Sequence, residues 1–303
     1  MSEQSYLDLL QDVMINGVTK SVFGQSDVTI KSVFGRQLRF DLSEGFPIYT
    51  TKKVYYRGAF EEMLWFIKGD GDITDLVKRG VHIWDEWAYK HFKKQDISTS
   101  LSQDEFISGL TERNEPFYLP IHYTNFTNWG EHNLDQMQWV VDGIRKNPDR
   151  KSYYVTCWNP EQAYQMAEQC NQESVVLVAC HTDHLVNVSD GKLSLRVNIR
   201  SNDLFLGNPF NVAQYAMLTH LYALLTGYEI GSLVVNIDDA HIYSNHFEQI
   251  ETQLTRTPSK FPSFYIKDRG QKKMQDFLIS DFLVEDYHPQ STIKGEVTLV
   301  GGY

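Results

Sequence analysis

The middle of this chain predicts a protein that mixes α-helices with β-strands. Residues 185–199 alternate between apolar and polar side chains on both sides of Asp190-Gly191, a dipeptide typical of two-residue hairpin turns. Two apolar runs, 175–178 and 233–237, have the composition of strands buried in a sheet. Between these runs, apolar residues recur with the helical period over 210–224. The sequence therefore predicts an α/β protein in which a hairpin leads into a long helix.

The predicted hairpin brings together residues that are far apart in the sequence. If Asp190-Gly191 forms the turn, Cys180 on the first strand lies opposite Ser201 on the second, one residue from Arg200. Strict alternation would place the side chains of Cys180 and Arg200 on opposite faces of the sheet. A β-bulge changes this alternation, and bulges are common beside active sites. We therefore expect a bulge near Cys180 that lets both side chains share one site.

The helix that follows the hairpin has recognisable ends. Asn208 is a good N-cap residue, and Pro209 suits the first helical position. The helix is expected to end at Gly227. Asn211 therefore falls in the first turn, where the positive end of the helix dipole favours partial negative charge on a ligand.

Cys180, Arg200 and Asn211 each have an ordinary structural interpretation as well. A free cysteine in an apolar strand is usually a small buried hydrophobic residue. Arg200 alone would be an exposed strand residue, and Asn211 alone an amide at a helix start. Together they supply a thiol, a guanidinium that favours the ionised thiol, and a carboxamide. This combination is typical of nucleophilic catalysis.

Length and composition exclude several classes of protein. The 303 residues carry a formal net charge of −11, which argues against general affinity for nucleic acid. No linker or internal repeat divides the chain, so we expect one domain over 1–303. There is no N-terminal targeting pattern and no apolar run long enough for a membrane span. Three cysteines form no secreted disulfide framework, which favours the cytoplasm.

Several blocks of sequence occur in the order found in one enzyme family. These blocks are TTKK at 50–53, EMLWFIKGD at 62–70, IWDEW at 83–87, CH at 180–181, RSND at 200–203, LG at 206–207, PFN at 209–211 and DAHIYSNH at 239–246. They span most of residues 30–300 and resemble the thymidylate synthase family. The resemblance implies a large mixed, mostly antiparallel sheet, with helices on one face and a second subunit on the other. Segments 89–118 and 161–174 lack such blocks, and we interpret them as insertions.

The resemblance also implies roles for individual residues. Cys180 resembles the nucleophile that adds to C6 of the pyrimidine, and Asn211 resembles the amide that reads its N3 and O4. Glu62 resembles the carboxylate that organises waters and proton transfer, and Tyr123 the tyrosine near removal of the C5 proton. Asp203 resembles a residue that contacts both the ring and the folate. The implied ligands of the phosphate and sugar are Arg200, Ser201, His241, Tyr243 and, from the second subunit of a homodimer, Lys151. The implied folate pocket consists of Lys52, Trp84, Trp87, Asp203, Leu206, Gly207 and Phe210.

The chemistry explains why such residue types are needed. Addition of a thiolate to C6 makes an enolate with its charge largely on O4, where hydrogen-bond donors stabilise it. C5 can then attack the one-carbon unit of 5,10-methylenetetrahydrofolate, and no metal is required. Hydride transfer from the folate gives a methyl group and dihydrofolate, whereas water gives a hydroxymethyl group. Trp84 would shield the intermediate from water and so favours the methyl product.

The chain departs from the family where the nucleotide phosphate is expected. Gln25 stands at an arginine position, and Lys151 and Ser152 stand where the second subunit donates two arginines. A lysine is a point charge and cannot replace the bidentate fork of an arginine. The cations available to compensate are Arg150, Lys20, Lys31 and Arg36. Otherwise the substrate differs from dUMP, so ribose or deoxyribose stays open. The C-terminal run 293–303 is also several residues longer than the family's tail.

These observations favour methylation of dUMP and leave other functions open. One alternative is hydroxymethylation of dUMP, UMP or CMP, as in phage DNA-modification or nucleoside-antibiotic pathways. The amide of Asn211 points to a uracil base, because the related phage deoxycytidylate hydroxymethylases carry a carboxylate there. Another is a binding protein without catalysis. A remote alternative is a metal-dependent hydrolase, whose ligands would come from Cys180, His181 and His184, or from Asp238, Asp239, His241 and His246.

Overall fold

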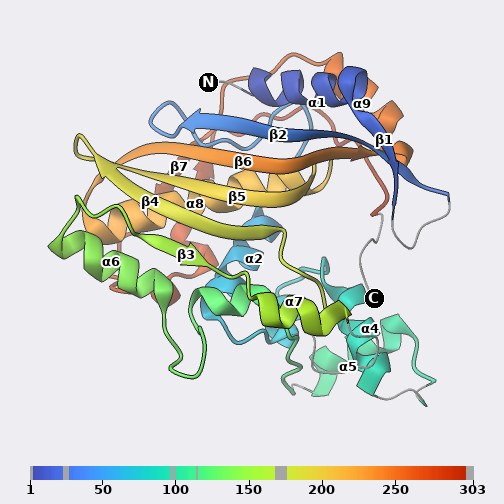
Figure 1. Ribbon diagram of the computed structural model, residues 1–303, viewed down its shortest axis with the longest axis horizontal. Coiled ribbons are helices and arrows are strands. Elements are labelled where there is room, and N and C mark those ends of the chain that lie inside the picture. The colour runs from blue at the N-terminus through green and yellow to red at the C-terminus, as the bar shows by residue number, and fades with distance from the viewer. Residues whose placement is uncertain are drawn as a thin grey trace.

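The computed structural model describes residues 3–22, 27–95, 98, 100–113, 115–167 and 176–297. Its centre is a six-stranded sheet in the order β1-β2-β6-β5-β4-β3 (Figure 1). The strands are β1 (Val18–Ser21), β2 (Thr29–Asp41), β3 (Tyr154–Thr156), β4 (His181–Ser189), β5 (Lys192–Asp203) and β6 (Glu229–Tyr243). Neighbouring strands run antiparallel except β5 and β6, which are parallel. The expected α/β fold with a large mixed, mostly antiparallel sheet is confirmed.

Two helices cover one face of this sheet. α8 (Gly207–Thr226) packs on β5 and β6, and α2 (Tyr56–Lys68) packs on α8; both lie behind the strands in Figure 1. Every second residue of the two central strands is buried on this face, at Leu193, Leu195, Val197, Ile199, Leu233, Val235 and Ile237. The alternating pattern therefore creates the core. The predicted strand 233–237 is confirmed as part of β6.

The hairpin turn has the predicted geometry. Ser189 pairs with Lys192 across Asp190-Gly191. Both turn residues have positive φ angles, 54° for Asp190 and 73° for Gly191. A two-residue turn with this backbone matches the right-handed twist of the strands. The turn thus fixes the register of β4 against β5.

The predicted bulge is present near the other end of the hairpin. The register between β4 and β5 shifts between His181 and Asp183. Beyond this shift, the N–H of Arg200 donates a hydrogen bond to the carbonyl of Cys180 at 2.9 Å. Cys180 therefore lies across from Arg200 and not from Ser201, as the expected bulge requires.

The start of α8 differs from the prediction. The helix begins at Gly207, and Asn208 lies inside it. The Tyr49 hydroxyl donates to Oδ1 of Asn208 at 2.8 Å, and Nδ2 of Asn208 donates to Asn202 at 2.7 Å. Asp203 instead accepts two backbone N–H groups just before the helix. The N-cap prediction for Asn208 was wrong because its amide is bound by residues distant in sequence. The predicted helix end is confirmed, with the residue after Thr226 in the left-handed conformation.

The apolar run 175–178 does not form the predicted strand over its described part. Val175 lies outside the described residues, and 176–178 contain no strand. The carbonyls of Val178 and Ala179 accept hydrogen bonds from the Arg200 guanidinium at 3.0 and 2.8 Å. These carbonyls bind a side chain and not the backbone of a neighbouring strand, so this part of the prediction was wrong.

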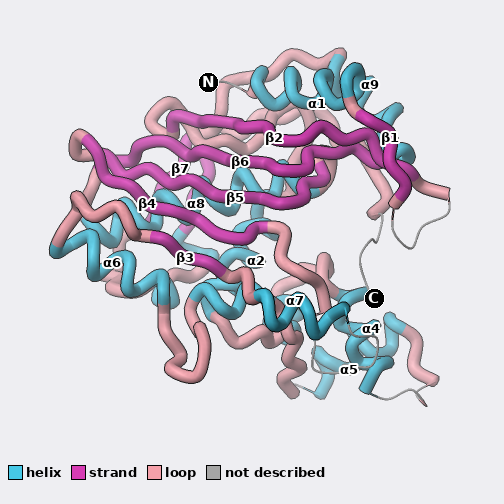
Figure 2. The backbone as a smooth tube through the Cα atoms, in the orientation of Figure 1, coloured by secondary structure: helices cyan, strands magenta, loops and turns pink. Residues whose placement is uncertain are grey.

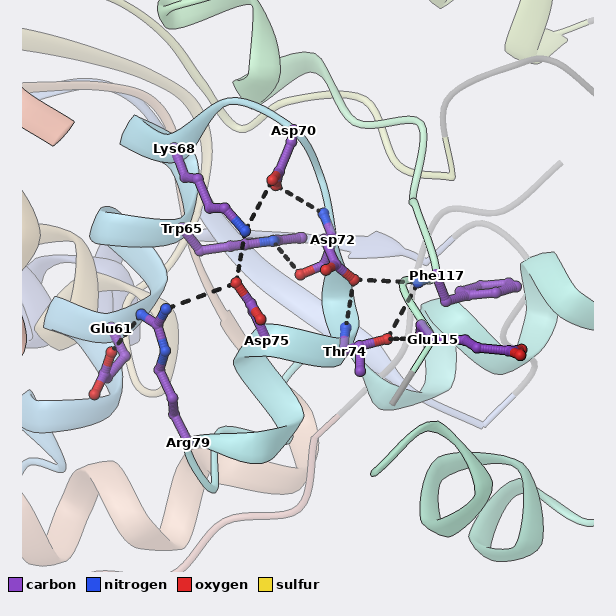
Figure 3. Close-up of polar contacts among 10 residues, drawn as sticks. All are labelled: Glu61, Trp65, Lys68, Asp70, Asp72, Thr74, Asp75, Arg79, Glu115 and Phe117. Atoms are coloured by element: carbon purple, nitrogen blue, oxygen red, sulfur yellow. Dashed lines mark hydrogen bonds and ion pairs between the residues drawn. The ribbon is translucent and has the colours of Figure 1, made fainter. Parts of the chain in front are cut away.

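A polar brace fixes the end of α2 relative to α3 (Ile73–Lys78), as Figure 3 shows. Asp72 caps α3 by accepting the N–H of Thr74 at 3.0 Å, and the same oxygen accepts the N–H of Phe117 at 3.1 Å. The indole of Trp65 donates to the Asp72 carbonyl at 2.9 Å. Because α2 also carries Glu62, this brace helps to hold the Glu62 carboxylate in place.

The remaining elements surround this core. They are α1 (Gln4–Asn16), α4 (Asp85–Gln95), α5 (Gln103–Arg113), α6 (Gln136–Lys146), α7 (Pro160–Ala167), α9 (Phe247–Leu254), a β7 (Ser263–Ile266) and β8 (Phe282–Glu285) pair, and short 3₁₀ turns. The predicted insertion 89–118 contains part of α4 and all of α5, which lie apart from the sheet in Figure 2. The second, 161–174, includes most of α7, but 168–174 lie outside the described residues. Both insertions and the single domain stay predictions. No helix in the described residues is long and apolar enough to cross a membrane.

The second face of the sheet carries a row of polar side chains. Gln37 donates to Asn236 at 2.8 Å, and Asn236 donates to Asn198 at 3.0 Å. Asn198 in turn donates to both oxygens of Asp183 at 3.1 Å. The row crosses β2, β6, β5 and β4, and in the single chain Gln37 is exposed, Asn236 and Asn198 are half-buried and Asp183 is buried. This face therefore differs chemically from the apolar face beneath α8.

Candidate active site

The Cys180 thiol lies at the start of β4, beside Tyr123 and Arg200. The Tyr123 hydroxyl oxygen accepts the N–H of Cys180 at 3.0 Å and that of His181 at 3.5 Å. Tyr123 belongs to a 3₁₀ turn, His122–Phe126, and its ring stacks on Phe66 with centroids 4.1 Å apart. Burial raises the pKa of the Cys180 thiol, and the charge of Arg200 opposes this rise. The resting form is therefore a thiol next to a cation that favours its ionisation.

Arg200 is held by the backbone and by an aromatic ring. Its Nε donates to the carbonyl of Ala179 at 2.8 Å, and its guanidinium lies 5.6 Å from the centre of the Trp158 ring. Trp158 also packs edge-on against His122, with ring centroids 5.5 Å apart. Burial, followed by the charge of Arg200, lowers the pKa of His122 to about 4. Arg200 therefore keeps its position beside Cys180 without a carboxylate partner among the described contacts.

The Glu62 carboxylate is buried and receives two short hydrogen bonds. The indole N–H of Trp84 donates to one oxygen at 2.6 Å, and the Gln214 amide donates to the other at 2.6 Å. Burial raises the pKa of Glu62 to about 7, although both hydrogen bonds act to lower it. Such a group exchanges protons near neutral pH, as a general acid or base must.

Asn211 lies in the first turn of α8, with both ends of its amide bound. Its Oδ1 accepts a hydrogen bond from Asn202 at 2.8 Å. Its Nδ2 donates to Gln214 at 3.4 Å, and Gln214 is the residue that contacts Glu62. The structure thus links Asn211 to Glu62 through one side chain.

His241 and Tyr243 lie on β6 next to a charged pair. Asp239 contacts Nδ1 of His241 at 3.1 Å and Nζ of Lys20 at 2.7 Å. Burial acts to raise the pKa of Asp239, but hydrogen bonds from His241, Lys20 and Ser32 lower it well below its usual range. Asp239 is therefore an anion that holds both a ring and an ammonium group. The His241 ring packs edge-on against Tyr243 at 5.2 Å between centroids.

The structure distinguishes among the four cations considered for the phosphate. Ser201 pairs with Asp239 across β5 and β6, and the ammonium of Lys20 binds the Asp239 carboxylate, so one side chain links Lys20 to the strand neighbour of this predicted phosphate ligand. The other three cations bind elsewhere; their partners are Asp12 for Arg36, the Met14 carbonyl for Lys31 and Ser152 for Arg150. Lys20 is the candidate that the described contacts support.

Five of the predicted folate residues lie at or around the start of α8, namely Lys52, Asp203, Leu206, Gly207 and Phe210. The Lys52 ammonium donates to the Phe205 carbonyl and lies 3.5 Å from the centre of the Phe205 ring. Burial lowers the pKa of Lys52 to about 7, against the opposing charge of Asp203. Trp84 and Trp87 are buried, whereas the residues half-buried around the helix start are Leu206, Gly207 and Phe210. Apolar surface beside a carboxylate and an ammonium suits a ring with polar edges.

Two predicted phosphate positions, Gln25 and Lys151, have different outcomes. Gln25 lies outside the described residues. Lys151 is exposed, and β3 leads from it towards Cys157, whose thiol donates to the carbonyl of His181 at 2.9 Å. An extended chain of that length places Lys151 roughly 20 Å from the Cys180 end of the sheet. Within one chain, Lys151 therefore does not join Arg200.

Several residues of the site escaped sequence reasoning. Gln214 follows Asn211 by three positions, so helical spacing would have placed the two side chains on one face. Asn202 stands between two recognised positions without a role of its own. No local signal marks Trp158, which reaches Arg200 only through the fold. Among the described residues, no group of three or more His, Cys, Asp or Glu side chains is arranged to hold a metal ion.

A comparison with protein families agrees with this arrangement. Residues 4–299 match the family model described as thymidylate synthase. The chain belongs to the thymidylate synthase family. Membership supports an enzyme that acts on pyrimidine nucleotides, with methylenetetrahydrofolate as co-substrate and one-carbon transfer to C5 as the general reaction. The family resemblance read from the sequence blocks is therefore confirmed.

The raised pKa of Glu62 predicts how stability changes with pH. Between the ordinary value of 4.5 and about 7, the folded protein keeps a proton that the unfolded chain has released. Raising the pH through this window therefore lowers the free energy of unfolding. In urea denaturation from about pH 5 to about pH 8, we expect the wild type to lose about 3 kcal/mol relative to Glu62→Gln. Glu251→Gln, at an exposed position, keeps Glu62 and should lose stability in parallel with the wild type. If the curve for Glu62→Gln were also parallel to that of the wild type, the prediction would be wrong.

Proposed function

We propose that this enzyme methylates C5 of dUMP, with 5,10-methylenetetrahydrofolate supplying both the one-carbon unit and the hydride. The observation that carries the proposal is the position of Trp84. Its indole binds Glu62 at 2.6 Å, and its ring packs edge-on against Tyr123 at 6.3 Å. A buried aromatic ring between these groups excludes water from the carbon that would otherwise be hydroxylated.

Cys180 is the proposed nucleophile, and its neighbours prepare it. The Cys180 thiol must lose its proton before its sulfur adds to C6. The positive charge of Arg200 stabilises the thiolate that this loss produces. Tyr123 holds the backbone N–H groups of Cys180 and His181, which fixes the direction of the sulfur. Burial raises the pKa of Tyr123 well above its usual value, so the group is a phenol. A phenol at this place relays the C5 proton and does not store a negative charge.

Glu62 and Asn211 complete the proposed chemistry at the ring. With a pKa of about 7, Glu62 exchanges a proton as charge appears on O4. Asn211 offers a donor to O4 and an acceptor to N3–H, which matches a uracil edge. His241 and Tyr243 are the proposed sugar ligands, and Asp203 is proposed to contact both the ring and the folate. Residues of the proposed folate pocket orient the co-substrate and exclude water around C5.

We further propose a homodimer formed through the polar face of the sheet. The row runs from the exposed Gln37 through two half-buried asparagines to the buried Asp183 and carries hydrogen-bonding groups that a second copy can complement. A partner would also supply Lys151, which one chain does not bring to Arg200. The altered phosphate ligands favour one alternative function, hydroxymethylation of dUMP, UMP or CMP without reduction.

The proposed reaction is tested by its products. The enzyme is incubated with methylenetetrahydrofolate and, separately, dUMP, UMP, dCMP or CMP, and the nucleotides are weighed by mass spectrometry. Thymidylate together with dihydrofolate, seen by its absorbance, is the expected result from dUMP. A hydroxymethyl product with tetrahydrofolate would replace the proposal by the alternative, and a cytosine nucleotide as best substrate would refute the reading of Asn211.

The nucleophile predicts a covalent adduct with a 5-fluorinated substrate. Fluorine at C5 cannot leave as a proton does, so 5-fluoro-dUMP and methylenetetrahydrofolate should remain bound to the protein, giving a mass increase on intact protein. Cys180→Ala should lose the adduct entirely. Cys157→Ala is the matched control, since this buried thiol is bonded to the His181 carbonyl. An adduct that persists in Cys180→Ala would exclude Cys180 as the nucleophile.

The position of Lys20 predicts a selective effect on nucleotide binding. Its ammonium binds Asp239, the strand neighbour of Ser201, and we propose that it also contacts the phosphate, so Lys20→Ala should raise KM for dUMP by about tenfold, the effect of one lost charge-assisted hydrogen bond. The kcat should change by no more than about twofold, because Lys20 is remote from C5 and C6. Lys31→Ala provides a control cation on the neighbouring strand. Equal changes in KM for both variants would contradict this assignment.

A further inference from the structure

Four buried amides form a continuous chain through the base end of the site. Asn208 donates to Asn202 at 2.7 Å, Asn202 to Asn211 at 2.8 Å, and Asn211 to Gln214 at 3.4 Å. Gln214 then donates to Glu62 at 2.6 Å. All four amides are nine-tenths or more buried. Each amide presents its NH₂ to one neighbour and its carbonyl to the other.

The chemistry at the Glu62 end fixes the direction of this chain. The Trp84 indole can only donate, and it occupies one oxygen of Glu62. When Glu62 is ionised, its other oxygen can only accept, so Gln214 must turn its NH₂ towards Glu62 and its carbonyl towards Asn211. The same reasoning passes from Asn211 to Asn202. At the far end, the Tyr49 hydroxyl donates to the carbonyl of Asn208, which agrees with this direction.

The direction matters because of how an amide reads a pyrimidine. In uracil, O4 accepts and N3–H donates, whereas in cytosine the 4-amino group donates and N3 accepts. Turning the Asn211 amide by half a turn would therefore exchange a uracil match for a cytosine match. A flip would also oppose two NH₂ groups at Asn202 and two carbonyls at Gln214. Each unsatisfied buried group would oppose the flip.

We propose that Asn202 and Gln214 are positioning residues that lock the Asn211 amide in the orientation that selects uracil over cytosine. This inference rests on the proposed function, because it assigns the base-reading role to Asn211. Neither residue touches the base itself. Their effect reaches the ligand only through the orientation of Asn211.

A pair of isosteric substitutions can reverse the chain. Asn202→Asp places an acceptor where Asn211 needs a donor, so Asn211 must flip or lose a hydrogen bond. Glu62→Gln supplies an NH₂ that can donate to the Gln214 carbonyl, which permits the opposite direction throughout. In the double variant, Asn211 and Gln214 can both flip, and each buried donor then again meets an acceptor. Residues 62 and 202 nevertheless share no hydrogen bond among the described contacts. Coupling between them must pass through Gln214 and Asn211.

The test measures dissociation constants for dUMP and dCMP without folate, together with melting temperatures. The wild type should prefer dUMP, Asn202→Asp should reduce the preference at least about tenfold, and the double variant should prefer dCMP. The double variant should also melt at least about 3 °C above Asn202→Asp. Asn202→Ala, which unlocks Asn211 without opposing it, should weaken the preference if Asn202→Asp does not fold.

Asn125→Asp is the matched control. Asn125 is also buried and donates to a carbonyl, that of Cys157, at 2.9 Å, but it lies outside the chain of amides. Asn125→Asp should lower the melting temperature and leave the ratio of dUMP to dCMP binding unchanged. When it is combined with Glu62→Gln, the two changes in melting temperature should be additive. Unchanged base preference in both Asn202 variants, or additive melting temperatures for Glu62→Gln and Asn202→Asp, would overturn the proposal. Failure of the wild type to bind either nucleotide would refute the proposed function, while the melting temperatures would still report on the chain.

Discussion

The burial of the Glu62 carboxylate constrains the base end of the site, by which we mean Glu62 and the chain of amides that leads from it to the proposed base-reading residue Asn211. Removing a carboxylate from water is costly unless donors surround it, and Trp84 and Gln214 provide them. An amide side chain has its hydrogen-bond donor on one side and its acceptor on the other. A hydrogen bond from Gln214 to Glu62 therefore also determines the orientation of the Gln214 amide and then that of Asn211. The pKa of about 7 shows that two hydrogen bonds do not fully compensate for burial. The same incomplete compensation gives Glu62 the proton affinity that its proposed role needs.

A second constraint acts on the thiol through the backbone. The shift in register between His181 and Asp183 sets Cys180 across from Arg200. Arg200 then binds the carbonyls just before Cys180, which ends strand pairing at that point. The carbonyls that would extend β4 hold the guanidinium instead. The position of Cys180 across from Arg200 and the irregular backbone before Cys180 therefore have one physical origin, since the same bulge produces both.

Local sequence patterns determined the parts of the fold that depend on near neighbours. The turn at Asp190-Gly191, the alternation of β5, the bulge and the end of α8 follow from spacing and backbone preference, and all are confirmed. Asn208 shows where such reasoning stops. Its amide satisfies the local rules for an N-cap, yet it binds Tyr49 and Asn202, which only the folded chain brings near.

The candidate site shows the same division between local and distant effects. The family blocks pointed to Cys180, Glu62 and Asn211, and the structure brings these residues into one region. The connections among them were not predictable, because Gln214 and Asn202 matter through contacts between α2, α8 and β5. The phosphate ligands stay proposals because they depend on contacts between chains. Lys151 would act in a second subunit, and no pattern within one chain shows where it lies relative to the partner's Cys180 and Arg200.

The two ends of the site respond differently to substitution for a physical reason. At the base end, each amide is buried and bonded on both sides, so a change there leaves unsatisfied groups that cost about 1–3 kcal/mol each. At the phosphate end, Lys20 and Lys151 are exposed, where most substitutions change stability by about 0.5 kcal/mol or less. A change of phosphate ligand therefore alters affinity while the fold stays intact. This asymmetry explains how the chain can carry Gln25, Lys151 and Ser152 where the family resemblance implies arginines and still keep the buried amides that are proposed to hold Asn211 for base reading.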